Sequence, residues 1–344
     1  MDTLTIRNPE TRRVGLLKKK PIMTAAVIAA PGRVELVQKD LPELGENEVR
    51  VRLEGCGVCG SSLAPWEGRP WFNYPLAPGE LGHEGWGMVD KIGPGVSQVS
   101  VGDRVSLLSY RAYAEYDVAP ESSVIGLPSQ LNGQPFPGEA LGCAMNVFRR
   151  SDIFPEQKVA IIGVGFLGAV LTALCAHAGA KVIAISRRGF ALEIARKMGA
   201  AETIALEDRN GIVEKVKALT AGNLCDCVIE AAGKQAPLDL AGELARERGR
   251  LIIAGYHQDG PREVNMQLWN WRGLDVINAH ERDPRIYISG MQAAAEAIAE
   301  GVFDPSPLYT HTFPLRQLSD ALNAMKQRPE GFLKALITYD NSAD

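Results

Sequence analysis

The stretch Lys158-Val-Ala-Ile-Ile-Gly-Val-Gly-Phe-Leu-Gly168 decides the fold of this chain. Its apolar start, Val159 to Ile162, predicts a buried parallel strand, and an Ala/Leu-rich helical stretch, 169–178, follows the glycines. A strand, a glycine turn and a helix in this order suit a dinucleotide, because the backbone can approach a pyrophosphate closely at the helix N-terminus. A second strand is expected at Lys181–Ser186, as such a fold requires. The alternative is a glycine turn that only joins a strand to a helix.

Composition describes an ordinary globular protein with enough length for two domains. The 344 residues are 46% hydrophobic and 23% charged, and the net charge is −4 with acidic and basic residues interspersed. This pattern lacks the basic footprint of a nucleic-acid-binding protein, and no apolar run reaches the length of a membrane span. Six cysteines without a small secreted framework favour free thiols in a reducing compartment. We therefore expect a cytoplasmic protein with neither nucleic acid nor membrane as a partner.

The chain divides by pattern into a leader, a β-rich part and a part in which strands alternate with helices. Residues 1–22 lack the apolar core of a signal peptide, and we expect them to form a disordered leader because a strand pattern begins at Met23. Short strands separated by glycine and proline follow as far as Val118. After a predicted helix, 139–151, strands and helices alternate from 157 to 278, which predicts a parallel, doubly wound sheet. A helix and a mixed tail close the chain.

Five short motifs occur in one order over nearly the whole chain. They are Gly57-Val-Cys59-Gly-Ser61, Gly82-His83-Glu84, Gly102-Asp103-Arg104-Val105, Gly163-Val-Gly165-Phe-Leu-Gly168 and Phe332-Leu-Lys-Ala335. With these motifs, residues 23–344 resemble a medium-chain dehydrogenase/reductase of the zinc-dependent alcohol and polyol dehydrogenase type. The resemblance implies an α/β architecture of two domains. One is a GroES-like β-rich catalytic domain, 23–146 with 285–344, and the other is a Rossmann cofactor-binding domain with a doubly wound parallel sheet, 147–284.

The chemistry of two loops also suggests zinc. Zinc takes thiolate, imidazole and carboxylate ligands, and a catalytic zinc keeps one tetrahedral position open. Cys59 and His83 each lie in a glycine-rich loop of the β-rich part, where a side chain can face a cleft. Cys59 alone would indicate a buried thiol, and His83 alone a loop histidine whose hydrogen bonds are satisfied. Together, in the motifs above, they are expected to be zinc ligands.

The third ligand is expected to be Glu139, and two alternatives stay open. Glu139 lies 24 residues before Gly163, where polyol-type relatives carry a ligand glutamate. Cys143 lies one helical turn further on and offers a thiolate, which is the softer ligand. Glu84 is the second alternative, because a carboxylate beside the ligand histidine can swing onto the metal.

Ser61 matches the hydroxyl with which the family bonds the substrate oxygen and relays its proton; the alternative is a serine that satisfies its own turn. The chain departs from the family just beyond. Ser62 stands where the family often has an acid, and Ala64 where it sometimes has a histidine. The family's outer relay and its contacts around the metal are therefore not carried over to this chain.

A larger departure concerns the number of metal ions. Relatives with a structural zinc insert a lobe with four closely spaced cysteines after the Gly-Asp-Arg-Val turn. In this chain Arg104-Val105 is followed almost at once by Tyr110-Arg-Ala-Tyr113, without such a lobe. We therefore expect one zinc per subunit, at the catalytic site.

The end of the second Rossmann strand predicts the choice of cofactor. An Asp or Glu there accepts from the ribose 2′-hydroxyl and repels a 2′-phosphate, whereas this chain has Ser186-Arg187-Arg188. A small hydroxyl followed by two guanidiniums suits a dianionic phosphate, so we expect NADP(H). NAD(H) is the alternative if both arginines only lie on a solvated helix start. The residues expected to contact the cofactor are Gly163, Gly165, Phe166, Leu167, Gly168, Ser186, Arg187, Arg188 and Ala232.

Two groups of aromatic residues suggest the class of substrate. They are Trp66, Trp71, Phe72 and Tyr74 between the two zinc-ligand loops, and Trp269 and Trp271 before the last Rossmann strand. If both groups line the cleft, flat rings with polar edges suit a sugar or cyclitol, with Trp71 and Asn146 as substrate contacts. The alternative is that these rings only pack their loops.

The predicted function is hydride transfer between an alcohol, best a polyol, sugar or cyclitol, and NADP(H), with Cys59, His83 and Ser61 as catalytic residues. A zinc-free quinone or enoyl reductase of the same fold is one alternative, against which the set Cys59, His83 and Glu139 argues. A non-catalytic NADP(H)-binding redox sensor is the other. The strand Leu274–Asn278, at the sheet edge, predicts a homodimer or a homotetramer, because its backbone groups would otherwise be exposed.

Overall fold

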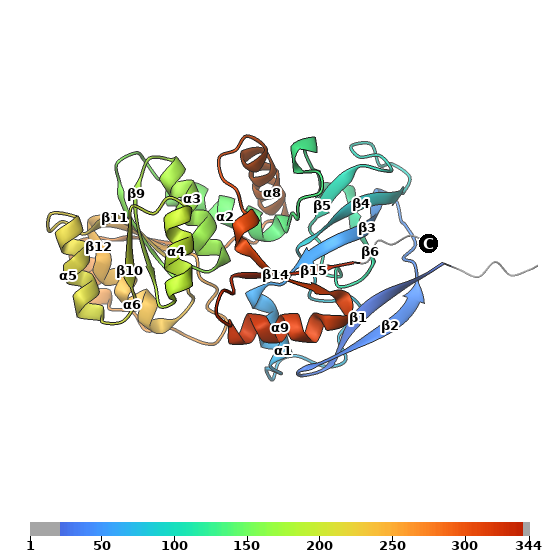
Figure 1. Ribbon diagram of the computed structural model, residues 1–344, viewed down its shortest axis with the longest axis horizontal. Coiled ribbons are helices and arrows are strands. Elements are labelled where there is room, and N and C mark those ends of the chain that lie inside the picture. The colour runs from blue at the N-terminus through green and yellow to red at the C-terminus, as the bar shows by residue number, and fades with distance from the viewer. Residues whose placement is uncertain (1–20, 340–344) are drawn as a thin grey trace, which may run out of the picture.

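The computed structural model describes residues 21–339 and contains two large sheets at opposite ends of the molecule (Figure 1). A parallel sheet with its helices forms one end, and a β-rich unit forms the other. Helices α2 (Gly138–Ser151) and α8 (Pro284–Ala299) lie between them. Both predicted architectures, the doubly wound parallel sheet and the unit of short strands, are confirmed. The predicted leader, 1–22, falls outside the described residues except at its end, where β1 already begins at Ile22.

The parallel sheet has six strands in the order β10-β9-β8-β11-β12-β13, and all its pairings are parallel. Its strands are β8 (Lys158–Ile162), β9 (Lys181–Ser186), β10 (Glu202–Ala205), β11 (Cys225–Glu230), β12 (Ala245–Ile253) and β13 (Asp275–Asn278). Its helices are α3 (Phe166–His177), α4 (Gly189–Lys197), α5 (Arg209–Leu219), α6 (Gln235–Leu244) and α7 (Met266–Arg272). The strand order reverses direction between β8 and β11, which is where such folds bind their ligands.

Both faces of the parallel sheet are buried, which explains the continuous apolar run of β8. Ala160 and Ile162 pack in the apolar cluster on one face, while Val159 and Ile161 pack in the cluster on the other. Successive side chains of a strand point to opposite faces, so both sets must be apolar when helices cover both sides.

The β-rich unit contains a mixed sheet built from both ends of the chain. Its order is β14-β15-β3-β4-β5-β7, with β6 also paired to β3. The strands are β3 (Glu48–Gly57), β4 (Gly85–Ile92), β5 (Arg104–Leu107), β6 (Tyr116–Pro120), β7 (Val124–Gly126), β14 (Tyr309–Pro314) and β15 (Lys334–Thr338). A separate hairpin consists of β1 (Ile22–Ala30) and β2 (Arg33–Asp40). Because Ile337 of β15 pairs with Cys56 of β3, the end of the chain completes the sheet that its beginning started.

Helix α2 joins the two units rather than belonging to one. Its Leu141 packs in the same apolar cluster as Met291 of α8, while its Val147 packs against the strand residues Val159 and Ile161. The domain boundary predicted between 146 and 147 therefore falls inside a continuous helix. A helix whose two ends are buried by different partners gives no sequence signal for a boundary in its middle.

Several short elements were not predicted. The helices α1 (Leu63–Trp66) and α7 and the strand β7 have too few residues to show a period. The helix α9 (Leu318–Gln327) lies in the mixed tail. Short 3-10 turns occupy Gly60–Ser62, Glu121–Ser123, Ser129–Leu131, Ser306–Leu308 and Leu315–Gln317. Among the described residues, no helix combines the length and apolar character needed to cross a membrane.

Candidate active site

Strand pairing brings the two predicted metal-ligand loops together. Cys59 follows β3, His83 precedes β4, and these strands pair so that Cys56 lies opposite Gly85. The loop that leaves one strand therefore lies beside the loop that enters the other. Ligand atoms of Cys59, His83 and Glu84 lie within 4.8 Å of one another.

The imidazole of His83 is fixed by the backbone two residues before it. Its Nδ1 lies 2.7 Å from the Leu81 carbonyl, so Nδ1–H donates and Nε2 is left for a metal or proton. Nε2 lies 3.5 Å from the Ser61 hydroxyl and 4.0 Å from the Glu139 carboxylate. Leu81 adopts a left-handed φ of +76°, which a bulky residue avoids, and such strain concentrates at functional sites.

Both candidates for the third ligand face this cluster from α2. Glu139 lies in the first turn of the helix and Cys143 one turn later, and the Cys143 thiol donates to Glu139 Oε1 at 3.2 Å. Burial raises the pKa of Glu139, and the neighbouring His83 partly offsets this. The second carboxylate oxygen, Oε2, is the one nearest the imidazole.

Glu84, the other alternative, is paired with a lysine from the far end of the chain. The ammonium of Lys334 lies 2.5 Å from Glu84 Oε2 and 2.7 Å from Oε1, and both residues are buried. The same ammonium lies 4.9 Å from the centre of the Phe166 ring, in the glycine turn. A Cβ on Gly57 would lie 1.8 Å from Glu84 Oε2, so glycine is required beside this pair.

Lys334 was not recognised as a site residue from the sequence. The signal was present: a lysine interrupts the apolar run Phe332-Leu-Lys-Ala-Leu-Ile337, which becomes β15. A charge at the start of a buried strand needs a partner, and here the partner is the acid next to His83.

The donor set fits a zinc ion. Burial disfavours the imidazolium of His83, but the charges of Cys59, Glu139 and Glu84 outweigh it and raise the pKa of His83 to about 10. The buried carboxylate of Glu84, the partly buried carboxylate of Glu139 and the partly buried thiols of Cys59 and Cys143 thus lie around one imidazole, with Lys334 as the only buried cation described beside them. Such a cluster favours a divalent cation, and thiolate, imidazole and carboxylate are the ligands of zinc.

The glycine turn has the geometry expected of a dinucleotide site. Gly163 has a φ of +101°, and a Cβ on Gly168 would lie 2.0 Å from the Gly163 carbonyl, so both positions require glycine for folding. Gly165 is different, because a Cβ there would meet no protein atom within 4 Å. It precedes α3, where an open backbone suits close approach of a pyrophosphate.

A buried acid orders the opposite wall of this turn. Glu230 ends β11 and accepts from the backbone N–H groups of Ala232 and Gly233 at 2.8 and 2.7 Å. It also lies 3.0 Å from His257 Nε2, while the Arg262 guanidinium donates to His257 Nδ1 at 2.8 Å. The imidazole therefore accepts at Nδ1 and donates at Nε2.

One hydrogen bond joins the segment after β12 directly to the loop of Cys59 and Ser61. The side-chain amide of Gln258 donates to the Gly60 carbonyl at 3.1 Å. Gly60 lies between Cys59 and Ser61, so the segment after β12 contacts the loop that carries the predicted ligand and relay.

The three residues at the end of β9 have different environments. Ser186 is buried, and its hydroxyl lies 3.5 Å from the Arg188 backbone N–H. Arg187 is exposed. Arg188 reaches the carbonyls of Phe332 and Val164, so its guanidinium already joins the Rossmann unit to the C-terminal segment.

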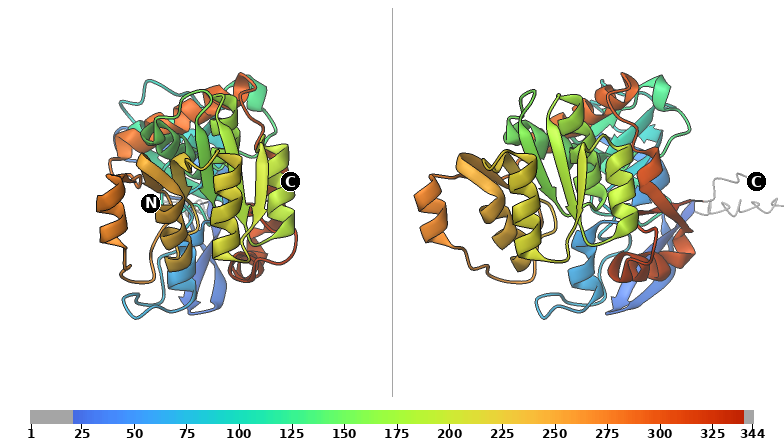
Figure 2. Two further views of the ribbon diagram at one scale, coloured as in Figure 1. Left: turned by 90° about the vertical axis from the view of Figure 1, so that its left-hand side faces the viewer. Right: turned by 60° about the vertical axis from the view of Figure 1, so that its left-hand side comes forward.

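The predicted aromatic cleft is corrected by the structure. Trp269 packs against the apolar core of the parallel sheet, and Trp271 is 84% exposed on α7. In the right-hand view of Figure 2, this orange helix lies at the outer end of the Rossmann unit, far from the blue N-terminal strands. Aromatic content alone does not tell in which direction a short helix presents its rings.

Of the aromatic residues between the two ligand loops and the predicted contact Asn146, some are packed in the protein and others are exposed. Trp66 is buried and donates to Asn323 at 3.1 Å, and the Tyr74 hydroxyl donates to the Pro65 carbonyl. Trp71 is 61% exposed. Asn146 is buried, and its amide donates to the Ile286 carbonyl at 3.1 Å, in the contact between α2 and α8.

Two tyrosines that the sequence did not single out approach the metal cluster. The ring centre of Tyr110 lies 6.0 Å from that of His83, because the short loop after β5 places it there. Burial, followed by the charges of Cys143 and Glu139, raises the pKa of Tyr287 above its usual range. The Tyr287 hydroxyl donates to the Glu281 carbonyl at 3.0 Å.

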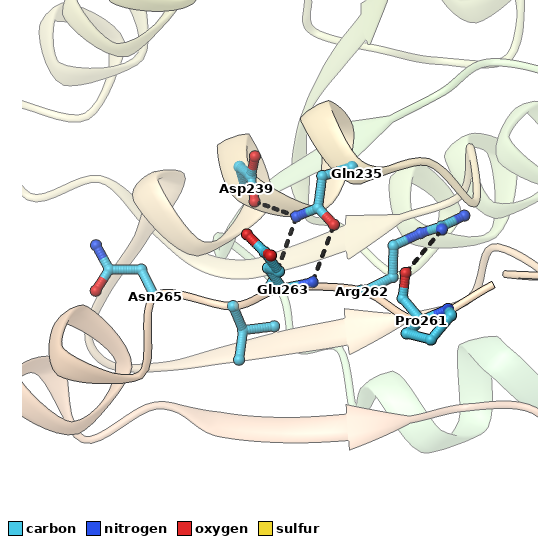
Figure 3. A pocket seen from close by; sticks show the side chains of 7 residues that line it. Gln235, Asp239, Pro261, Arg262, Glu263 and Asn265 are labelled. Atoms are coloured by element: carbon cyan, nitrogen blue, oxygen red, sulfur yellow. Dashed lines mark hydrogen bonds between the residues drawn. The ribbon is translucent and has the colours of Figure 1, made fainter.

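A hollow of about 590 Å³ lies elsewhere (Figure 3). It is lined by Gln235, Asp239, Pro261, Arg262, Glu263, Val264 and Asn265. Gln235 bonds to Asp239 and to the backbone of Glu263, so its polar groups already pair with one another. None of these residues belongs to the metal cluster.

Known proteins with similar sequences and folds cover almost the whole chain. Residues 45–129 match the alcohol dehydrogenase GroES-like domain, and residues 167–297 match the zinc-binding dehydrogenase domain. Sorbitol dehydrogenase of Rattus norvegicus is 26% identical over 337 residues, which cover 88% of this chain and 92% of that protein. L-threonine 3-dehydrogenase of Bacillus subtilis (strain 168) is 25% identical over 325 residues, which cover 85% and 91%. The solved structure of zinc dependent alcohol dehydrogenase 2 from Streptococcus pneumonia has a TM-score of 0.83 at 23% identity and covers 94% of this chain and 100% of its own.

Proposed function

The chain belongs to the zinc-dependent medium-chain dehydrogenase/reductase family, and from this premise we propose that it transfers a hydride between a polyol-type alcohol and NADP(H). The observation that carries the proposal is the cluster of Cys59, His83 and Glu84, whose ligand atoms lie within 4.8 Å of one another, with the Glu139 carboxylate 4.0 Å from His83 Nε2. Lys334 contacts both Glu84 and Phe166, so it joins the metal cluster to the cofactor turn.

Three side chains are proposed to hold one zinc ion: Cys59, His83 and Glu139. Glu84 also lies close to the cluster, but its carboxylate is neutralised by Lys334, whereas Glu139 accepts from the Cys143 thiol and lies 4.0 Å from His83 Nε2. When bound, zinc polarises the substrate oxygen and the nicotinamide exchanges the hydride.

The chain's own residues orient the reactants and move the proton. The Leu81 carbonyl holds His83 in the tautomer whose Nε2 faces the cluster. The Ser61 hydroxyl, 3.5 Å from that nitrogen, accepts the proton of an alcohol substrate while its own proton passes to solvent water, and in the reverse direction the two protons return. The Gln258 amide holds the loop of Ser61 against the cofactor wall, which keeps donor and acceptor at reacting distance.

The proposed preference for NADP(H) rests on the end of β9, where no acid stands to repel a 2′-phosphate. Arg187 is exposed and has no carboxylate partner in the described part of the chain, so its guanidinium is available. Arg187→Ala should weaken NADPH binding about tenfold to a hundredfold and leave NADH binding nearly unchanged. Equal affinities of the unmodified protein for NADPH and NADH, in a fluorescence titration, would refute this preference.

The proposed substrate class is a cyclic or linear polyol. The phenols of Tyr110 and Tyr287 near the cluster, with the exposed ring of Trp71 in the loop before His83, offer flat faces with polar edges. A site built to bond hydroxyl groups discriminates against substrates that lack them. Sorbitol dehydrogenase of Rattus norvegicus, one of the relatives, is named after a polyol.

A kinetic panel tests the substrate class. Polyols and n-alkanols are compared as substrates with NADP+ and with NAD+, by absorbance of the reduced cofactor. We expect a higher kcat/KM for polyols, and a raised KM for polyols in Trp71→Ala. If simple primary alcohols outperform every polyol in the panel, the polyol proposal is wrong, while the dehydrogenase itself stands.

A further inference from the structure

A third arginine begins a turn that contacts the end of β9, where the 2′-phosphate is proposed to bind, but it comes from the other structural unit. Arg328 ends α9 as its C-terminal cap, just before β15. In the turn that follows, the Phe332 N–H donates to the Pro329 carbonyl at 3.0 Å, and the Phe332 carbonyl accepts from the Arg188 guanidinium. The end of β9 and the turn that begins at Arg328 are thus in direct contact.

The backbone at Arg328 is in a conformation that suits glycine. Its φ of +49° lies in the left-handed region, and glycine is the usual residue at such a helix end because it has no Cβ. An arginine in this conformation is less favourable for the backbone than glycine would be.

Arg187, Arg188 and Arg328 together form a positive cluster without a counter-charge. In the part of the chain that the structure describes, none of the three pairs with a carboxylate. Burial and then the charges of Arg328 and Arg187 lower the pKa of Arg188. Arg328 as a whole residue is exposed, but the protein around its guanidinium removes water from the charge and lowers its pKa. The charge of Arg187 lowers this pKa further.

We propose that Arg328 is a specificity-determining residue for NADP(H), which binds the 2′-phosphate from the β-rich unit while Arg187 and Ser186 bind it from the Rossmann unit. A dianion between these groups would relieve the mutual repulsion of the guanidiniums and accept charge-assisted hydrogen bonds from them. Arg188 has another part, because its guanidinium fixes the turn after Arg328. The inference rests on the proposed preference for NADP(H) and adds a contact from outside the Rossmann fold.

The test uses two fragments of the cofactor that differ only in the 2′-phosphate. Binding of adenosine 2′,5′-bisphosphate and of 5′-AMP to the full-length protein is measured by isothermal titration calorimetry. Arg328→Gly removes the guanidinium and also the backbone strain, so the variant should fold at least as well as the parent. We expect it to weaken the bisphosphate roughly tenfold to a hundredfold and to change 5′-AMP less than about twofold.

Two further variants separate charge from structure. Arg328→Lys keeps a cation and should retain part of the bisphosphate affinity. Arg248→Gly is the matched control: Arg248 is also exposed and left-handed, with a φ of +53°, but lies near the beginning of β12, away from the strand ends that face the cofactor. Arg248→Gly should leave the affinities for the bisphosphate and for 5′-AMP unchanged.

The outcomes distinguish this inference from the proposed cofactor preference. If Arg187→Ala weakens the bisphosphate and Arg328→Gly does not, the inference is overturned and the preference for NADP(H) stands. If Arg328→Gly weakens both ligands equally, Arg328 does not read the 2′-phosphate and the inference is again overturned. If the unmodified protein binds the bisphosphate no more tightly than 5′-AMP, the preference fails and the inference fails with it.

Discussion

The Lys334 ammonium and the Glu84 carboxylate form a buried ion pair 2.5 Å long between residues 250 positions apart in the sequence. Glu84 adjoins the proposed ligand His83, and Lys334 lies in the last strand, β15. The pair therefore fixes the charge next to the metal cluster from the far end of the chain.

Breaking this pair should destabilise the fold. Lys334→Met leaves the Glu84 carboxylate buried without its cation, which should lower the free energy of unfolding by about 3–5 kcal/mol. Adding Glu84→Gln should recover part of that loss, because no lone charge then remains buried. Urea unfolding of the unmodified protein, the two single variants and the double variant measures the coupling free energy between Lys334 and Glu84. A double variant no more stable than Lys334→Met alone would contradict the account.

The metal content should depend on Glu139 and not on Cys143. Elemental analysis of the unmodified protein should give one zinc per chain, and Glu139→Ala should lose most of it. Cys143→Ala is the matched variant one helical turn away and should keep the metal, because its thiol only donates to Glu139. The reverse result would transfer the ligand role to Cys143, and two zinc ions per chain would contradict the expected count.

Two glycines of the same turn should respond in opposite ways to alanine. Gly168→Ala places a Cβ 2.0 Å from the Gly163 carbonyl, so the melting temperature should fall. Gly165→Ala meets no protein atom within 4 Å and should leave the melting temperature unchanged, yet weaken NADPH binding because the pyrophosphate loses its close approach. Calorimetry and cofactor titration measure the two effects. Unchanged NADPH affinity in Gly165→Ala would place the pyrophosphate elsewhere.

Asp117 should make stability decrease as the pH rises. Burial raises its pKa from 3.8 to about 6, although the Ser109 hydroxyl and the Val118 N–H partly offset this. The folded chain therefore binds this proton more tightly than the unfolded chain. The resulting stability is complete below about pH 4 and is lost as the pH rises through about 6, a change of at most roughly 3 kcal/mol. Asp117→Asn should remove this loss, so its unfolding free energy relative to the parent should increase between about pH 4 and 7.5; a constant difference would contradict it.

The exposed edge strand predicts the oligomeric state. β13 lies at the edge of the parallel sheet, where Val276 is 39% exposed and Trp271 of the preceding helix is 84% exposed. We expect a homodimer, or a homotetramer made from two, to cover these groups. Light scattering at micromolar concentration should show the assembly, and Val276→Lys should shift it toward the monomer. A monomer mass for the unmodified protein would reject the assembly.

The sequence predicted the Rossmann unit best, because its fold follows from local patterns. The apolar run of β8 and the glycines after it are adjacent in the chain, and their period shows directly whether one or both faces are buried. The loops of Cys59 and His83 were also found, since each lies at the end of a strand with glycines around it.

Contacts between distant segments were not predicted. Nothing near Lys334 shows that its partner is Glu84, and nothing near Gln258 shows that it bonds Gly60. The helical period puts Glu139 and Cys143 on one face but does not say which side chain reaches the metal. Such choices depend on how the two units pack, and that packing leaves no periodic trace in the sequence.

The pairing of β15 with β3 also has a consequence for synthesis on the ribosome. The Rossmann unit is a continuous segment and can fold as soon as it has emerged, whereas the sheet beside the metal loop needs strands from both ends of the chain. At translation rates of roughly 5–20 residues per second, β3 waits some tens of seconds for its partner strand. Throughout that interval Glu84 lacks its cation and the strand edge at Cys56 lacks its neighbour. The nascent chain is therefore most exposed to chaperones, and to misfolding, in its N-terminal third.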